Sequence, residues 1–226
     1  MGTFLNIYKS SIGKKIVMAV TGLFLCTFLV EHLAGNLLLF RDDAGAAFVE
    51  YSDFMSHNFI VRTIEIVLAI AFIGHILTGA ILWIKNKMAR GQTYQMNQAS
   101  ANSALSSRTA FLTGSIVFIF LVIHLRTFWV PNRFFPTENP SLYVLVVTAF
   151  TSPSYDLFYL VALVLLAYHL HHGFQSAFQT FGIRNEKFIP LIEFIGMIFW
   201  FLIPLGFAII PAYFFWLSHF GGMNIL

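Results

Sequence analysis

The chain has 226 residues, of which 58% are hydrophobic and only 10% are charged, and its mean hydropathy is +0.77. Soluble domains carry roughly 25% charged residues, so this composition excludes an ordinary water-soluble domain and predicts a lipid bilayer as the main surroundings of the chain. The net charge of +3 comes from short basic clusters between apolar runs, which is typical of membrane loops and argues against nucleic-acid binding.

Five apolar runs are each long enough to cross a hydrocarbon core of ~30 Å, which needs ~20 helical residues. The runs are continuous and show no polar–apolar alternation, so they predict helices rather than the strands of a barrel. We therefore expect an all-α integral membrane protein, one membrane domain of five transmembrane helices, of which the first four form an up-down bundle. The spans are expected at about 15–40, 61–85, 109–130, 155–181 and 190–217.

The connections between the first four runs are hydrophilic and are expected to be loops outside the bilayer. In the last run, Pro190 suits the first turn of a helix, whereas Pro204 and Pro211 are predicted to kink it.

Basic residues indicate the orientation of the chain. The N-terminal segment and the second and fourth connections hold nine of the thirteen Lys and Arg residues, and most acidic loop residues lie in the other connections. The positive-inside rule then places the N-terminus in the cytoplasm and the C-terminus outside.

Four of the eight histidines fall one per run in the first four runs. Ionisable side chains inside a span are costly, so each is a functional candidate, although any one alone is equally well explained as a histidine hydrogen-bonded within the bundle. Their distances from the run ends, with alternating helix direction, give two depths. Alternate helices of an up-down bundle face each other, so two pairs are predicted. They are His32 with His124 in the outer half and His75 with His169 in the inner half.

Glycines follow a matching repeat. Gly22 and Gly114 each precede the histidine of their own helix by ten residues, and Gly79 and Gly173 each follow theirs by four. Ten residues span ~15 Å, which puts Gly22 and Gly114 near the depth of the other pair. A glycine there would let a flat macrocycle pass close to the backbone. The other reading is that small residues simply let membrane helices pack.

Two opposed imidazoles in a dry apolar bundle suit bis-histidine haem, which needs two axial nitrogens and leaves the iron six-coordinate for electron transfer. Zinc would need four ligands, and the nearby Glu31 is turned ~100° away from His32. The single cysteine, Cys26, excludes a thiolate metal site, and no Cys-x-x-Cys-His is present. Two non-covalent b-type haems, one per pair, are therefore the expected cofactors.

Two further histidines, His171 and His172, are rivals of His169, but only His169 has the glycine at plus four. His172 lies one turn along the same face and could serve a haem propionate or an internal hydrogen bond, whereas His171 points elsewhere.

Several segments resemble one known family. They are the stretch His32-Leu-x-x-Asn, His75 with Gly79, His124, and the run His-Leu-His-His-Gly-Phe-Gln-Ser-Ala-Phe-Gln-Thr-Phe-Gly that begins at His169. The likeness is to the di-haem cytochrome b subunit of succinate:quinone oxidoreductase (succinate dehydrogenase or fumarate reductase), of the single-subunit, five-helix type. It covers nearly the whole chain.

This resemblance implies that His75 and His169 hold the haem nearer the catalytic subunits and that His32 and His124 hold the distal haem. It implies a membrane anchor in a bacterial cytoplasmic (inner) membrane that binds a flavoprotein subunit and an iron–sulfur subunit. The anchor would exchange electrons with the quinone pool, in particular menaquinone, and the complex could form dimers.

The resemblance also implies an acidic quinone-site residue in the first outer loop, for which Glu50 and Asp53 are the nearest matches; the other reading is a solvated acidic loop. Some fumarate-reducing members carry a glutamate two residues before the fourth-helix ligand, where this chain has Ala167, so that proton pathway is not expected. Charged or polar residues that could neutralise propionates are Arg126 and Arg133 on the outer side and Arg108, Ser176 and Arg184 on the inner side.

Two other readings stay open. The cytochrome b anchor of a formate dehydrogenase or hydrogenase also holds two haems in a helical bundle, but its histidine spacing differs. A haem-free transporter or channel could use the histidines as proton-relay groups. Catalysis on succinate itself is not expected here, because the chain has no flavin fingerprint or dinucleotide loop.

Overall fold

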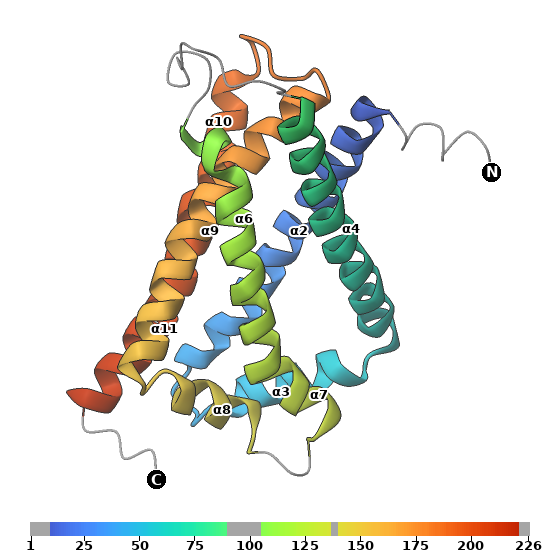
Figure 1. Cartoon of the computed structure of the whole chain (residues 1–226). Coiled ribbons are helices and arrows are strands. Elements are labelled where there is room, and N and C mark those ends of the chain that lie inside the picture. The colour runs from blue at the N-terminus through green and yellow to red at the C-terminus, as the bar shows by residue number, and fades with distance from the viewer. Residues whose placement is uncertain (1–9, 90–104, 137–139, 222–226) are drawn as a thin grey trace.

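The computed structural model describes residues 10–89, 105–136 and 140–221, and the regular elements in these ranges are all helical (Figure 1). Five stretches are long and apolar enough to cross a membrane, which confirms the expected all-α membrane fold. Each lies within a few residues of its predicted position. The stretches are Ser11–Phe40, Phe59–Met88, Thr109–Phe134, Pro153–Thr180 and Ile189–His219.

The first four stretches are built on four helices that alternate in direction (Figure 1). These helices are α2 (Ser11–Asn36), α4 (Phe59–Ala89), α6 (Leu105–His124) and α9 (Pro153–Thr180). α2 packs against α4 and α9, and α6 packs against α9, whereas α4 and α6 touch over few residues. α2 is therefore diagonally opposite α6, and α4 is diagonally opposite α9.

The fifth stretch comprises α10 (Ile189–Met197), η3 (Ile198–Leu202) and α11 (Ile203–His219), and it packs chiefly on α9. η3 is a π-helical segment, as is η2 (Leu125–Trp129), which joins α6 to α7 (Val130–Phe134). Each π segment ends two residues before a proline, Pro131 or Pro204. Proline has no N–H and its ring clashes with the carbonyl four residues earlier, so a wider turn relieves the conflict. Pro211 lies inside α11 without ending it.

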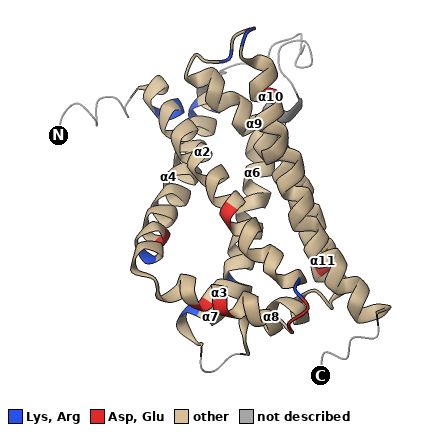
Figure 2. Cartoon of the chain, turned by 180° about the vertical axis from the view of Figure 1, so that it is seen from behind, with Lys and Arg blue, Asp and Glu red and all other residues tan. Residues whose placement is uncertain are grey.

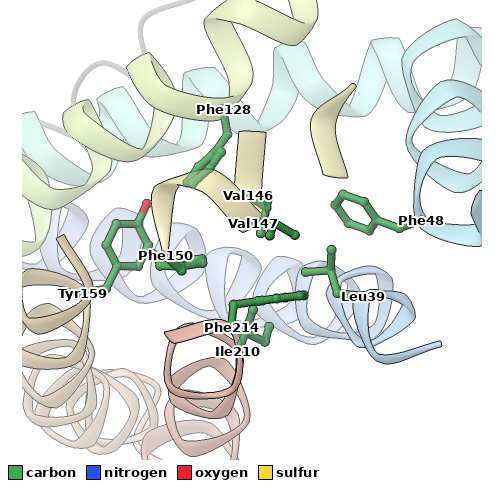
Figure 3. Close-up of a cluster of buried hydrophobic side chains, with 9 residues drawn as sticks. All are labelled: Leu39, Phe48, Phe128, Val146, Val147, Phe150, Tyr159, Ile210 and Phe214. Atoms are coloured by element: carbon green, nitrogen blue, oxygen red, sulfur yellow. The ribbon is translucent and has the colours of Figure 1, made fainter. Parts of the chain in front are cut away.

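Two short helices occupy connections that the sequence assigned to loops. They are α3 (Ala46–His57) and α8 (Leu142–Ala149), which cover one end of the bundle, hereafter the α3 end (Figure 1). The signal that could have revealed α3 is Asp43, whose carboxylate accepts hydrogen bonds from the backbone N–H groups of Gly45 and Ala47. Figure 3 shows the cluster of buried side chains to which α3 and α8 contribute. It consists of Leu39, Phe48, Phe128, Val146, Val147, Phe150, Tyr159, Ile210 and Phe214.

The opposite end, where α2 starts and α9 meets α10, is hereafter the α10 end. Figure 2 shows Lys and Arg residues near the start of α2 and in the turn between α9 and α10, while most Asp and Glu residues lie towards the α3 end together with other arginines. By the positive-inside rule, these basic residues predict that the α10 end faces the cytoplasm.

Glycine substitutions test the contact between α8 and the start of α3. Gly45 has φ +82°, and a Cβ there would approach the ring of Tyr143 to 2.2 Å; Gly182 has φ +72° but open space around it. Both alanine variants carry a backbone strain of about 1–2 kcal/mol, and Gly45→Ala adds an overpacking cost of about 1–3 kcal/mol. We expect the thermal midpoint of the detergent-solubilised chain to fall further in Gly45→Ala than in Gly182→Ala. Equal shifts would contradict the Tyr143 contact.

Candidate functional site: two opposed histidine pairs

The diagonal helices bring four histidines together as two pairs. The ring centroids of His32 on α2 and His124 on α6 are 5.7 Å apart, with an interplanar angle of 86°. Those of His75 on α4 and His169 on α9 are 6.3 Å apart, at 78°. Two imidazoles on opposite sides of one metal, each with its nitrogen ~2 Å from the ion, have centroids ~6 Å apart. Both pairs therefore have the spacing of two axial ligands, and they are the pairs that the helix directions predicted.

The glycines ten residues before two of the histidines lie against the other pair. A Cβ on Gly22 would come within 3.2 Å of Cε1 of His75, and a Cβ on Gly114 within 3.1 Å of Cε1 of His169. These glycines therefore lie at the depth of the other pair, as expected, and the protein group next to each is the imidazole of that pair. The other two glycines differ, because Gly79 has only an ordinary contact with a methionine and Gly173 borders open space.

A threonine fixes the tautomer of His75. The Thr21 hydroxyl donates to the carbonyl of Val17 at 2.7 Å, and Nδ1 of His75 lies 3.1 Å from the same Oγ1. Because the hydroxyl proton is already committed, Oγ1 can only accept from His75, so the imidazole proton is on Nδ1. The lone pair of Nε2 is then available, which is the state of a metal-binding histidine oriented by a hydrogen bond from its other nitrogen.

The corresponding residue on the other side is Thr113, which is buried and donates to the carbonyls of Thr109 and Ala110 at 3.2 and 3.1 Å. Nδ1 of His169 is buried, and its approach to the Ala110 carbonyl falls short of hydrogen-bond geometry. An unsatisfied polar nitrogen inside a membrane bundle is costly. Unlike at His75, no hydrogen bond from the described residues to Nδ1 fixes the tautomer of His169.

The second pair has polar and aromatic neighbours at the α3 end. Nδ1 of His124 lies 3.0 Å from the hydroxyl of Tyr159, which is buried and accepts a hydrogen bond from Tyr155. The amide nitrogen of Asn36 donates to the carbonyl of His32 at 2.7 Å and lies 3.5 Å from Nδ1 of the same residue. Aromatic rings border the two imidazoles. They belong to Phe28, Phe120, Phe128 and Phe207.

The rival histidines on α9 are engaged elsewhere. His172 lies 3.3 Å from the hydroxyl of Ser176, in agreement with an internal hydrogen bond. His171 lies 3.3 Å from the amide nitrogen of Gln175 and contacts the ring of Trp200 edge-on at 5.1 Å, on the far side of α9 from the pair. His169 is the histidine of this run that meets His75.

The predicted propionate arginines are exposed where the structure describes them. Arg126 lies on η2, Arg133 lies on α7 over the ring of Phe134 at 5.8 Å, and Arg184 follows α9. None of these three forms an ion pair with a carboxylate of the described residues. The backbone of Arg108 belongs to α6, but its side chain lies outside the described part.

The two acidic candidates on α3 have different surroundings. Glu50 lines a cavity of about 320 Å³ together with Arg41, Tyr51 and Phe54. Asp53 is exposed and lies 3.2 Å from Nδ1 of His57, away from that cavity. The structure thus separates them and leaves Glu50 as the better candidate.

The cavity beside Glu50 adjoins the histidine region through a tyrosine. The hydroxyl of Tyr51 donates to the carboxylate of Glu31, the residue before His32. Burial, and then the hydrogen bond and charge of Glu31, raise the pKa of the Tyr51 phenol above its ordinary value, so Tyr51 stays a neutral donor. Sequence reasoning missed this contact because the two residues lie on different helices.

Fold and site define the chain as an α-helical membrane protein with two opposed histidine pairs at two depths. Comparisons with protein-family models, curated proteins and solved structures found no match. The assignment of function therefore depends on the residues, their geometry and the resemblance of the motifs.

Cysteine cross-linking tests the pairing without any cofactor. In a chain carrying Cys26→Ala, a short bifunctional thiol reagent should join His75→Cys to His169→Cys. It should also join His32→Cys to His124→Cys. The mismatched combination of positions 32 and 169 should stay separate, because it differs by ~15 Å in depth. Gel mobility after cleavage between the helices reports the link, and equal yields in all three combinations would contradict two levels.

Proposed function

We propose that this chain is the membrane anchor and electron-transfer subunit of a succinate dehydrogenase or fumarate reductase. It passes electrons between an iron–sulfur subunit and a quinone, in particular menaquinone, through two b-type haems. The observation that carries the proposal is the pair of ring separations, 5.7 and 6.3 Å, between histidines of diagonally opposite helices. The family-like segments of the sequence support the specific enzyme.

The residues present fit haem at both levels. Each pair offers two neutral imidazoles and no third ligand, since the described residues contain no cluster of three or more His, Cys, Asp or Glu suited to a metal ion. Thr21 orients His75 with Nε2 free, and the aromatic rings around the other pair would suit a flat apolar group. The two histidines of each pair would hold the haem, which would supply one-electron redox chemistry.

The two levels suit electron transfer across the membrane. Gly22 touches His75 and lies ten residues before His32 on the same helix, so the pairs are ~15 Å apart along the bundle. Under the proposed orientation, the His75–His169 level is nearer the cytoplasm and the His32–His124 level is nearer the outside.

The proposed partners follow from the same orientation. The α10 end, with its Lys and Arg residues, would face the cytoplasm and bind the iron–sulfur subunit, which carries the flavoprotein subunit. The cavity beside Glu50 at the α3 end would serve quinone near the outer surface of a bacterial inner membrane, and the complex could form dimers.

Histidine substitutions test the cofactor assignment. In complex purified after growth with ample haem, we expect two b haems per chain and a bis-histidine spectrum. His75→Ala should lose the haem of one redox potential and His32→Ala the haem of the other, because each removes one axial ligand. His57→Ala, at the exposed end of α3, is the control and should keep both. A wild-type chain with no Soret band would refute the proposal. Oxidation of formate or hydrogen by the intact complex would instead identify the chain as the anchor of a formate dehydrogenase or hydrogenase.

Thr21 should act as a positioning residue for one haem only. Thr21→Val removes the hydroxyl acceptor of the His75 Nδ1 proton and leaves the backbone carbonyl of Met18 beside it. Loss of such a partner weakens metal binding by about 10–100-fold. We expect faster haem loss from the His75–His169 level, measured by transfer to an apo-haemoprotein, and rescue by Thr21→Ser. Thr27→Val is the matched control, because the Thr27 hydroxyl bonds only the carbonyl of Phe24 and is exposed. An equal effect of both valine variants would point to general destabilisation.

A further inference from the structure

A second cavity, of about 470 Å³, lies between α9 and the α10–η3 stretch, away from both histidine pairs and from Glu50. Its volume is within the range of ~300–1,000 Å³ that small-molecule sites occupy. Ile192 and Phe174 at its floor are buried, whereas Phe194 and Met197 are exposed on the membrane-facing side of α10. The cavity is thus a pocket that opens towards lipid.

Three polar side chains line this pocket within otherwise apolar spans: His171, Gln175 and Glu193. Polar groups inside a membrane span are costly, so each is a candidate for a functional role. The amide nitrogen of Gln175 lies 3.3 Å from Nε2 of His171. When Gln175 donates to Nε2, the imidazole proton is on Nδ1, and that N–H is available to an acceptor on an occupant.

Aromatic rings form the walls. Trp200 meets His171 edge-on at 5.1 Å, and the buried ring of Phe174 stacks on Phe199 at 5.2 Å. Gly196 allows α10 to approach α9 here, because a Cβ would come within 3.1 Å of Phe174. Trp200 belongs to the π segment η3 that Pro204 imposes, so the fold itself sets the position of this wall.

The lining selects the chemistry of the occupant. An anionic lipid headgroup would meet the Glu193 carboxylate, and among the described residues no Lys or Arg lines the pocket to offset the repulsion. An uncharged flat ring with carbonyl oxygens would stack on the aromatic walls, accept a hydrogen bond from His171 and leave its apolar tail in the bilayer.

We propose that this pocket binds the ring of a quinone, at a site separate from the cavity beside Glu50. The inference rests on the proposed function and adds a quinone site on the α9–α10 face. His171 and His169 are two residues apart on nearly opposite sides of α9, so the ring lies about one helix diameter, ~10 Å, from the His75–His169 level.

Proton supply follows from the depth of Glu193. This residue is four positions into α10, ~6 Å from the end of the span, and its side chain is exposed. Reduction of the ring to a quinol takes two electrons, which in the proposed function come from the iron–sulfur subunit, and two protons, one on each carbonyl oxygen. Both protons are drawn from water at the α10 end, and Glu193 is the carboxylate of the lining that passes them to the ring.

The experiment is photolabelling of the intact complex in nanodiscs with an azido-naphthoquinone that carries a short isoprenoid tail. We expect label on the peptide that contains α10 and η3, protected by excess menaquinone. Trp200→Leu should lower this label at least tenfold and Trp200→Phe should retain it. Trp216→Leu, an exposed tryptophan near the far end of α11, should leave it unchanged.

Glu193→Gln is expected to bind the probe but to slow quinol formation, with Glu186→Gln as the control on the same side of the membrane. Label confined to the Glu50 region, undiminished label in Trp200→Leu, or protection by phospholipid in place of menaquinone would each overturn the inference. Haem content is measured in every sample. Two haems with no label on α10 and η3 reject this site alone, whereas absence of haem in the wild type rejects the proposed function.

Discussion

The close approach of an imidazole to the backbone of a neighbouring helix is the contact on which the site depends. His75 reaches the centre of the bundle over Gly22 of α2, and His169 does so over Gly114 of α6. Any side chain larger than hydrogen at these glycines would displace the ring edge, so the spacing within the histidine pair depends on both. The threonine before Gly22 then supplies the hydrogen bond that selects the tautomer.

The packing of α4 leaves its centre available for such a site. α4 packs on α2 and touches α6 over few residues, with one side-chain tie to the α6 run near each of its ends. At one end Trp83 stacks on Phe111 with ring centroids 4.0 Å apart, and at the other Nε1 of Trp129 donates to Glu65 at 3.0 Å. Arg62 in turn bonds Glu65. Between these ties, the space between α4 and its diagonal partner is bordered by His75 and His169.

Two prolines shape the surroundings of the site through the turns that precede them. η2 begins directly after His124 and ends before Pro131, and η3 ends before Pro204. A π turn adds a residue to one helical turn and therefore rotates the side chains that follow. This rotation sets the direction of the side chains in the segment after His124 and of the aromatic wall at Trp200. A continuous α-helix would point these side chains in other directions.

The sequence by itself determined the spans, the depth of each histidine and the pairing across the bundle. Hydrophobicity and the rise of ~1.5 Å per residue are local properties, so the positions of His32, His75, His124 and His169 along the membrane normal follow from counting. Other features depended on how the helices are rotated about their own axes. They are the contact of Gly22 with His75, the placement of Glu50 but not Asp53 at the cavity, and the contact of Tyr159 with His124. The tertiary structure alone decided these contacts, because rotation and short capping helices such as α3 and α8 are set by side-chain packing between segments far apart in the chain.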